Sequence, residues 1–126
     1  MIDRGFTYCV PPFMIRAEVV TGVMSFAEMD AMMYKIEGED LYLIGTSEHS
    51  MIGKFIDTIT PEKELPYTLT SYSPCFRKEK GAHGIEERGV YRIHQFEKQE
   101  MIVVCKPEES PKYFDVLWQN TVDLFR

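Results

Sequence analysis

Two stretches of alternating side chains, joined by a polar loop, constrain the fold of this chain most strongly. The first is Tyr67–Phe76, which continues with an arginine and a glutamate, and the second is Val90–Cys105. Successive side chains of a β-strand point to opposite faces of a sheet, so a period of two predicts strands. Residues 80–89 between them are polar and rich in glycine. We therefore predict a long hairpin, in which Pro74 marks a bulge or an edge.

The loop end of this hairpin concentrates charged side chains on one predicted face. Arg77 and Glu79 share a face in the first strand, and the same period aligns a second set: Arg92, His94, Phe96, Lys98 and Glu100. Arginine–glutamate pairs on strands are often solvated ion pairs, and a lone phenylalanine is often core. We interpret His94 as a hydrogen-bonded structural residue, because no second base or nucleophile accompanies it. Together, the guanidiniums, carboxylates and aromatic ring can hold a nucleoside triphosphate beside a small amino acid.

The N-terminal part of the chain predicts short elements. Phe6–Val10 is a β-rich run that ends at Pro11–Pro12, which cannot extend a central ladder. Ala17–Met33 predicts a loop with a short helix. The two apolar runs that flank Glu37–Asp40 predict a tight hairpin.

A strand end is followed directly by a helix start near position 46. Gly45 ends the strand, and Thr46 and Ser47 offer two hydroxyl groups as N-caps of a helix from about Glu48 to Phe55. Glu48 lies in the first turn, where the helix dipole favours an anion. The sequence therefore predicts a polar loop directed from the end of a strand, although Thr46 and Glu48 can equally serve only as cap and dipole partner.

The C-terminal part predicts one amphipathic helix, with Ser110 as its N-cap and Pro111 as its first helical residue. Apolar and small side chains recur at steps of three and four residues, which predicts one face packed on the sheet: Phe114, Leu117, Thr121, Leu124 and Phe125. Strands joined by hairpins, with helices packed against them, indicate an α+β domain built on an antiparallel sheet.

Composition excludes several classes of protein. The net charge is −6 and the basic residues are dispersed, which does not fit an autonomous nucleic-acid-binding domain. Cys9, Cys75 and Cys105 lie far apart without a CxxC pair, which argues against a disulfide framework or a zinc site and favours a reducing, cytoplasmic location. No apolar run approaches the ~20 residues of a membrane span.

The motifs resemble those of a known family. Phe76–Glu100, with FRKE before the loop and RIHQFEKQE after it, resembles motif 2 of class II aminoacyl-tRNA synthetases, and of the seryl-tRNA synthetase branch in particular. Gly45–Glu48 resembles the TxE element of that branch, and the segment from Gly5 to Pro12 resembles the end of motif 1. The resemblance implies that residues 1–126 are part of a class II catalytic core, with its antiparallel sheet flanked by helices.

The resemblance also implies a reaction, in which a serine carboxylate attacks the α-phosphorus of ATP and pyrophosphate leaves. Arg77 is the implied catalytic residue, because a guanidinium can hold the serine carboxylate and an α-phosphate oxygen together. By the same resemblance, Glu79 meets the adenine amino group, Arg92 meets the γ-phosphate and Phe96 stacks under the adenine.

Serine recognition is implied for three residues. Glu100 would contact the substrate hydroxyl and amino groups, Thr46 would lie beside the ammonium, and Glu48 would support the pocket. A buried group that pairs with a hydroxyl rejects alanine, because that group is otherwise left unpaired. Mg²⁺ would bridge the phosphates without a ligand from this segment, and the loop from Lys80 to Gly89, with Arg88, would approach the end of the tRNA.

These features predict the central part of a catalytic domain that makes seryl-adenylate and transfers serine to tRNA(Ser). Motif 3 and the N-terminal helical arm of the family are not found in the sequence, so we expect an internal fragment. We also expect a homodimer formed through the motif 1 strand. The alternatives are an enzyme that delivers a small amino acid to a carrier other than tRNA, and a non-catalytic dimerising fragment.

Overall fold

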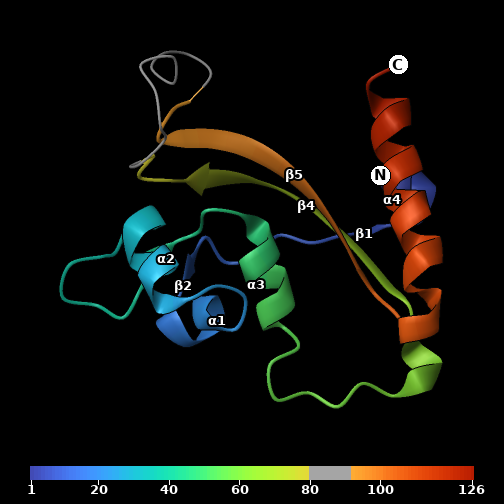
Figure 1. Cartoon of the computed structure of the whole chain (residues 1–126), viewed down its shortest axis with the longest axis horizontal. Coiled ribbons are helices and arrows are strands. Elements are labelled where there is room, and N and C mark those ends of the chain that lie inside the picture. The colour runs from blue at the N-terminus through green and yellow to red at the C-terminus, as the bar shows by residue number, and fades with distance from the viewer. Residues whose placement is uncertain (80–91) are drawn as a thin grey trace.

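A twisted two-stranded ladder forms the centre of the molecule in the computed structural model, which describes residues 1–79 and 92–126 (Figure 1). Strand β4 (Tyr67–Phe76) pairs antiparallel with β5 (Gln95–Val104). The register runs without interruption from Tyr67 opposite Val104 to Phe76 opposite Gln95. The predicted long hairpin is therefore confirmed, and β4 has the bounds that the alternation indicates.

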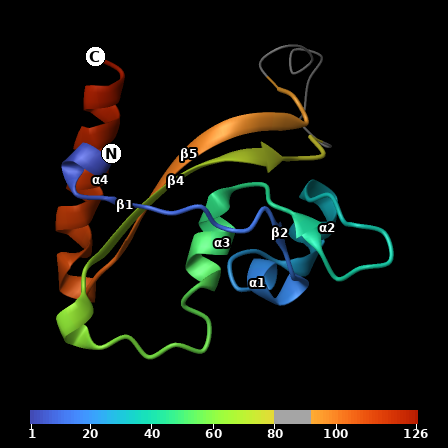
Figure 2. The ribbon, with the colours of Figure 1, turned by 180° about the vertical axis from the view of Figure 1, so that it is seen from behind.

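A short third strand completes this sheet. Strand β1 (Thr7–Tyr8) pairs parallel with β4 at Leu69 and Thr70, which gives the order β1-β4-β5. Figure 2 shows this side of the hairpin, with β1 in front. The sheet is thus mostly antiparallel, with helices around it, as the α+β prediction requires.

A second, smaller sheet lies beside the first. It pairs β2 (Met14–Ile15) with β3 (Tyr42–Leu43) in antiparallel fashion. The predicted turn over residues 37–40 is present, because Lys35 bridges Tyr42 and the amide of Ile36 donates to the Leu41 carbonyl over 2.9 Å. The sequence did not reveal that the strand partner of β3 comes from the segment after the two prolines.

Two short helices close the core next to this sheet. They are α1 (Ala17–Thr21) and α2 (Phe26–Met32). A capping box starts α2, in which Ser25 accepts from the Glu28 amide and the Glu28 carboxylate accepts from the Ser25 amide. The buried cluster joins both helices to the small sheet and consists of Ile15, Val20, Met29, Met33, Tyr42 and Ile44.

Helix α3 (Ser47–Gly53) carries the TxE-like segment onto the hairpin. Thr46 is its N-cap and accepts from the Glu48 amide over 3.3 Å. The second predicted cap hydroxyl, that of Ser47, instead makes a buried hydrogen bond with the hydroxyl of Ser71 on β4. This contact fixes the start of α3 against the central strand, because both hydroxyl groups are removed from water and need a partner.

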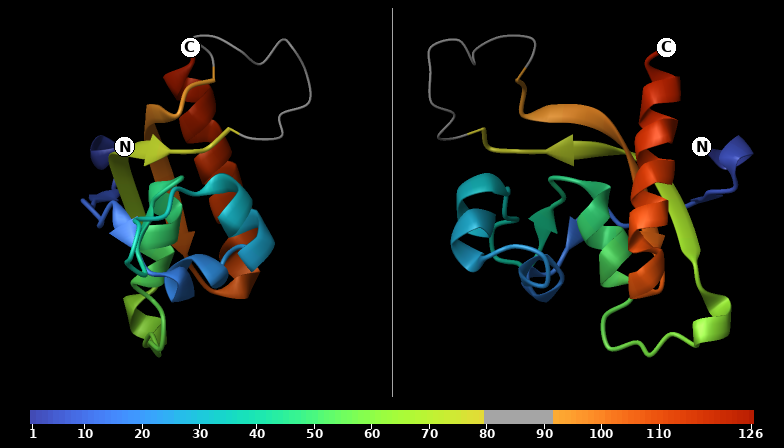
Figure 3. Two further views of the ribbon diagram at one scale, coloured as in Figure 1. Left: turned by 90° about the vertical axis from the view of Figure 1, so that its left-hand side faces the viewer. Right: turned by 45° about the vertical axis from the view of Figure 1, so that its right-hand side comes forward.

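Helix α4 (Ser110–Leu124) stands at the end of the hairpin far from the loop, whereas α1, α2 and α3 gather at the other side of the molecule (Figure 3). The predicted apolar face of this helix is wrong in part. Phe114, Leu124 and Phe125 are exposed at 69%, 62% and 83%, while Asn120 is buried. Asn120 accepts a hydrogen bond from Arg4, which lies in the 3₁₀ turn η1 (Ile2–Arg4). This polar contact decides which face of α4 points towards the rest of the molecule.

The remaining short elements are the 3₁₀ turns η2 (Glu62–Glu64) and η4 (Pro107–Glu109). Helix α4 begins one residue earlier than predicted, so Glu109 occupies the N-cap position and Ser110 is the first helical residue. None of the helices in the described ranges is long and apolar enough to span a membrane.

The hairpin differs from the prediction at its loop end. Strand β4 ends at Phe76, and Glu79 has a φ of 52°, so Arg77 and Glu79 do not continue the strand period. Strand β5 begins at Gln95, so Arg92 and His94 precede it. The ladder stops here because the chain turns away at a left-handed residue, which no regular strand contains.

Pro74 lies within β4 opposite Glu97 and causes no bulge in the register. The amide of Phe76 donates to the Ile44 carbonyl, so the even-numbered amides of this part of β4 point away from β5. The missing amide of Pro74 therefore points away from β5, and the ladder between β4 and β5 loses no hydrogen bond. The predicted bulge is wrong, and Pro74 lies on the side of β4 where β1 pairs with Leu69 and Thr70.

Candidate functional site

Arg77 is anchored at the end of β4 by two contacts of its side chain. Its Nε donates to the Gly45 carbonyl over 3.0 Å, and its guanidinium carbon lies 5.3 Å from the centre of the Phe96 ring. In the described residues, Nε is the side-chain nitrogen of Arg77 that forms a hydrogen bond. The terminal amino groups of the guanidinium are therefore available to an anionic ligand, while the rest of the side chain is held.

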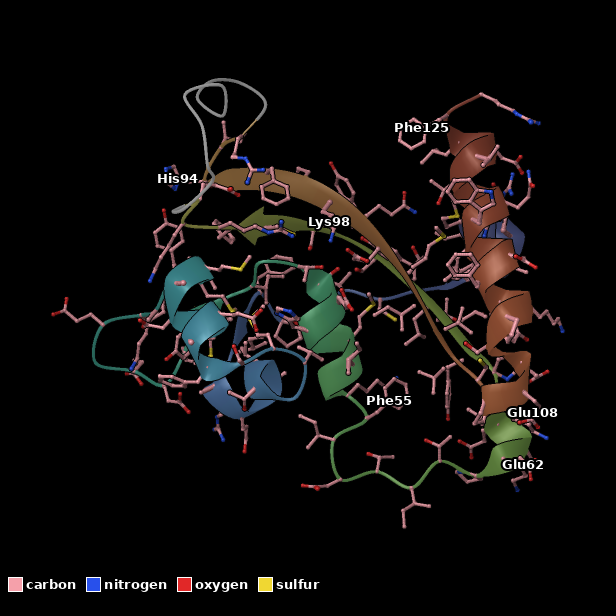
Figure 4. The ribbon with its side chains drawn as sticks, viewed as in Figure 1. Phe55, Glu62, His94, Lys98, Glu108 and Phe125 are labelled. Atoms are coloured by element: carbon pink, nitrogen blue, oxygen red, sulfur yellow. The ribbon has the colours of Figure 1, made fainter. Side chains whose placement is uncertain are left out.

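Three residues from two elements form a polar cluster next to Arg77. The Thr46 hydroxyl donates to Oε1 of Glu100 over 3.0 Å and accepts from Nζ of Lys98 over 3.2 Å. Lys98 also forms an ion pair with the same oxygen of Glu100. Figure 4 shows Lys98 on β5, on the side that faces α3.

The cluster leaves one carboxylate oxygen of Glu100 available. Both of its contacts are made by Oε1, and within the described ranges no hydrogen bond or ion pair involves Oε2. The side chain of Glu100 is 16% exposed, so Oε2 belongs to a largely desolvated group that can still accept a hydrogen bond. Phe96, Lys98 and Glu100 share one face of β5, as the period of two predicts.

Glu79 and Arg92 meet each other across the base of the loop. Nη1 of Arg92 donates to Oε2 of Glu79 over 2.6 Å, and their side chains are 46% and 15% exposed, respectively. The sequence places both on one strand face, whereas in the structure both lie beyond the strands and are brought together by the turn at Glu79. Lys80 and Arg88, the predicted tRNA-contacting residues, lie outside the described residues.

Glu48 does not join the cluster. Its side chain is exposed, and it makes no hydrogen bond or ion pair in the part of the chain that the structure describes. Its amide is held by the Thr46 hydroxyl. Glu48 lies in the first turn of α3, where its charge complements the helix dipole, and its support of the serine pocket stays a prediction.

His49 is a buried residue of the site that sequence reasoning missed. It is 7% exposed, and its Nδ1 has no hydrogen-bond partner in the described ranges. Burial lowers the pKa of His49 below its ordinary value of 6.5; the charge of Glu48 opposes this shift, whereas those of Arg77 and Lys98 add to it. The spacing of three residues from Thr46 on a helix could have indicated that His49 faces the same way.

Lys98 was also missed as a site residue, although its position between Phe96 and Glu100 at strand period was visible.

The described residues contain no group of three or more histidine, cysteine, aspartate or glutamate side chains that could hold a metal ion. The three cysteines are unpaired.

A family model for the class II core domain of tRNA synthetases, of the G, H, P, S and T type, matches residues 32–126. The chain belongs to this family. The matched range contains every candidate residue of the site, from Thr46 to Glu100.

Within the family, the chain is similar to serine–tRNA ligases. It is 46% identical over 124 residues to the serine–tRNA ligase of Picrophilus torridus, and this alignment covers 98% of this chain and 28% of that protein. It is 44% identical over 126 residues to the serine–tRNA ligase of Methanocella arvoryzae, and this alignment covers 100% of this chain and 30% of that protein. The chain thus spans less than a third of the length of these relatives.

Solved structures show the same similarity. The seryl-tRNA synthetase of Pyrococcus horikoshii complexed with ATP superimposes with a TM-score of 0.93 at 43% identity, over 98% of this chain and 28% of that one. The cytoplasmic serine–tRNA ligase of Naegleria fowleri in complex with AMP gives a TM-score of 0.88 at 36% identity, over 98% and 30%. The predicted family and fold class are confirmed.

The depressed pKa of His49 predicts a pH-dependent stability. Because its pKa in the folded chain lies below 6.5, the unfolded state binds more protons on acidification, and stability falls as the pH drops through that value. Chemical unfolding of the chain between about pH 7.5 and about pH 5.5 should show this loss, and it should shrink in His49→Leu. Equal pH dependence in both proteins would show that His49 does not carry it.

Proposed function

We propose that the protein containing this chain activates serine with ATP to form seryl-adenylate and then transfers the serine to tRNA(Ser). The observation that carries this proposal is the arrangement of Arg77, whose Nε donates to Gly45 while its terminal amino groups make no hydrogen bond to any residue that the structure describes. A guanidinium held in this way can bind the serine carboxylate and an α-phosphate oxygen at once. It then stabilises the charge that develops as the carboxylate attacks phosphorus and pyrophosphate leaves.

ATP would use the residues around Arg77. Phe96 is half-buried beside the guanidinium and offers its ring to the adenine. The Glu79–Arg92 ion pair joins the two residues across the base of the loop, and the nucleotide would exchange this contact for its own. Glu79 would then accept from the adenine amino group, and Arg92 would reach the γ-phosphate.

Mg²⁺ is proposed to bind together with the nucleotide. The described residues offer no cluster of metal ligands, so the phosphate oxygens would supply the hard donors that Mg²⁺ prefers. Bound there, the ion would neutralise phosphate charge.

Serine would use the cluster of Thr46, Lys98 and Glu100. Oε2 of Glu100, which has no partner among residues 1–79 and 92–126, would accept a hydrogen bond from the serine hydroxyl or ammonium. The Thr46 hydroxyl orients the carboxylate through its 3.0 Å hydrogen bond. Where Oε2 accepts from the hydroxyl, alanine is disfavoured, because it leaves a desolvated carboxylate oxygen without its partner.

We also propose that the protein is a cytoplasmic homodimer. Strand β1 pairs with β4 along one edge, and apolar side chains in β1 and in the segment that follows it are exposed: Tyr8, Val10, Phe13 and Met14. A cavity of about 430 Å³ lies next to them and is lined by Pro11, Pro12 and residues of α1 and α3. An exposed apolar strand edge beside a cavity is a suitable surface for a second copy.

Arg77→Lys tests the nucleotide site. Lysine retains the charge but loses the planar fork, so we expect the affinity for Mg-ATP to fall on the order of tenfold or more. Isothermal titration of the chain measures it. Arg4→Lys is the matched control, since Arg4 binds Asp123 and Asn120 far from this site. Equal losses in both variants would contradict the role of Arg77.

Glu100→Gln tests serine recognition. We expect a seryl-sulfamoyl-adenosine analogue to lose on the order of tenfold to a hundredfold in affinity, because a hydrogen bond to a charged group is lost. ATP and the alanyl analogue should change much less. A parallel fall for all three ligands would make Glu100 a structural residue.

Sedimentation across a concentration series tests the dimer. We expect the chain to sediment as a dimer and Val10→Asp to shift it towards monomer, because the new charge is buried on association. Ile59→Asp is the control, since Ile59 is 97% exposed elsewhere and Val10 is 69% exposed. A monodisperse monomer at high micromolar concentration would refute the interface.

A further inference from the structure

The backbone of Arg77 is held by a histidine side chain just beyond the end of the ladder. The Arg77 amide donates to the His94 carbonyl over 3.0 Å, which continues the pairing of β4 and β5 by one step. The Arg77 carbonyl oxygen faces the imidazole of the same residue, His94, whose Nδ1 lies 3.2 Å away. His94 therefore contacts both polar groups of the Arg77 backbone.

Tyr34 holds the imidazole in this position. Its hydroxyl lies 2.6 Å from the same Nδ1 of His94, and the two rings are 6.1 Å apart. A carbonyl oxygen can only accept, so Nδ1 satisfies both contacts only when it carries the proton. In that tautomer, Nδ1–H donates to the Arg77 carbonyl and to the tyrosine oxygen, and the two contacts hold the ring in one orientation.

Tyr34 itself belongs to the helical part of the molecule. It follows α2, and its carbonyl accepts from the Leu43 amide over 2.9 Å. The neighbouring Lys78 is tied to the same region, because its amide donates to the Met32 carbonyl over 2.9 Å and its Nζ donates to the Asp30 carbonyl over 2.7 Å. The last residues of α2 and Tyr34 thus contact the chain directly after the last residue of β4.

We propose that Tyr34 and His94 form a latch that positions Arg77 for its ligand. The guanidinium reaches the Gly45 carbonyl only if the Arg77 backbone stands at the right place, and Figure 4 shows His94 at the loop end of β5, where that backbone turns. The latch fixes the backbone from one side, and Gly45 fixes the side chain from the other. Tyr34 and His94 are positioning residues, and their role in catalysis rests on the function proposed for Arg77.

Tyr34→Phe removes only the hydroxyl and keeps the ring. We expect the affinity of the chain for Mg-ATP to fall about three- to tenfold, the effect of one lost hydrogen bond, and the Arg77 Nε–H signal in ¹⁵N NMR spectra to exchange faster with water. Tyr67→Phe is the matched control, because the Tyr67 hydroxyl also makes a hydrogen bond, to Glu64, away from the site. Equal effects of the two variants, or an unchanged Arg77 signal in Tyr34→Phe, would overturn the latch.

A pair of His94 variants separates positioning from packing. Asn places an amide nitrogen near the position of Nδ1, so His94→Asn should retain most of the Mg-ATP affinity, whereas His94→Leu should lose it. If both lose it equally, the imidazole acts by its bulk and the latch is wrong. If the wild-type chain binds no Mg-ATP but Tyr34→Phe still frees the Arg77 Nε–H, the latch stands and the proposed function fails.

Discussion

The unbroken register of β4 and β5 is the constraint on which the rest of the structure depends. Ten-residue strands in one register decide which side chains share a face, so Phe96, Lys98 and Glu100 all point to the side where α3 packs. A slip of one residue would send each of them to the opposite face. The hydrogen bond from the Phe76 amide to the Ile44 carbonyl then attaches the α3 side of the molecule to the ladder.

The site is a set of opposite charges that are held but incompletely satisfied. Within the described residues, Arg77 forms a side-chain hydrogen bond through Nε and not through its terminal amino groups, and Glu100 forms contacts through Oε1 and not through Oε2. A side chain that is already held at one end loses less conformational entropy when a ligand binds than an unrestrained side chain does. These groups would suit the ligand that we propose, which has an anionic part near Arg77 and a donor group near Glu100.

Much of the fold can be predicted from local pattern. The bounds of β4, the start of α3 at a threonine cap and the position of α4 all follow from alternation, capping residues and three-four spacing. The face of α4 could not be predicted in this way. Its periodicity is compatible with burial of Phe114, but the contact of Asn120 with Arg4, 116 positions away in sequence, places that polar residue inward instead.

The sequence by itself determined the family, the hairpin and the residue types of the site, because each of these depends on a local pattern of residues that are close together in the sequence. Only the tertiary structure decided which of those residues meet. Arg77 meets Gly45 across 32 positions, Thr46 meets Glu100 across 54, and Tyr34 meets His94 across 60. The physical reason is that side-chain period reports which face a residue occupies, whereas a contact between distant segments depends on how the whole chain packs, and no local pattern contains that information.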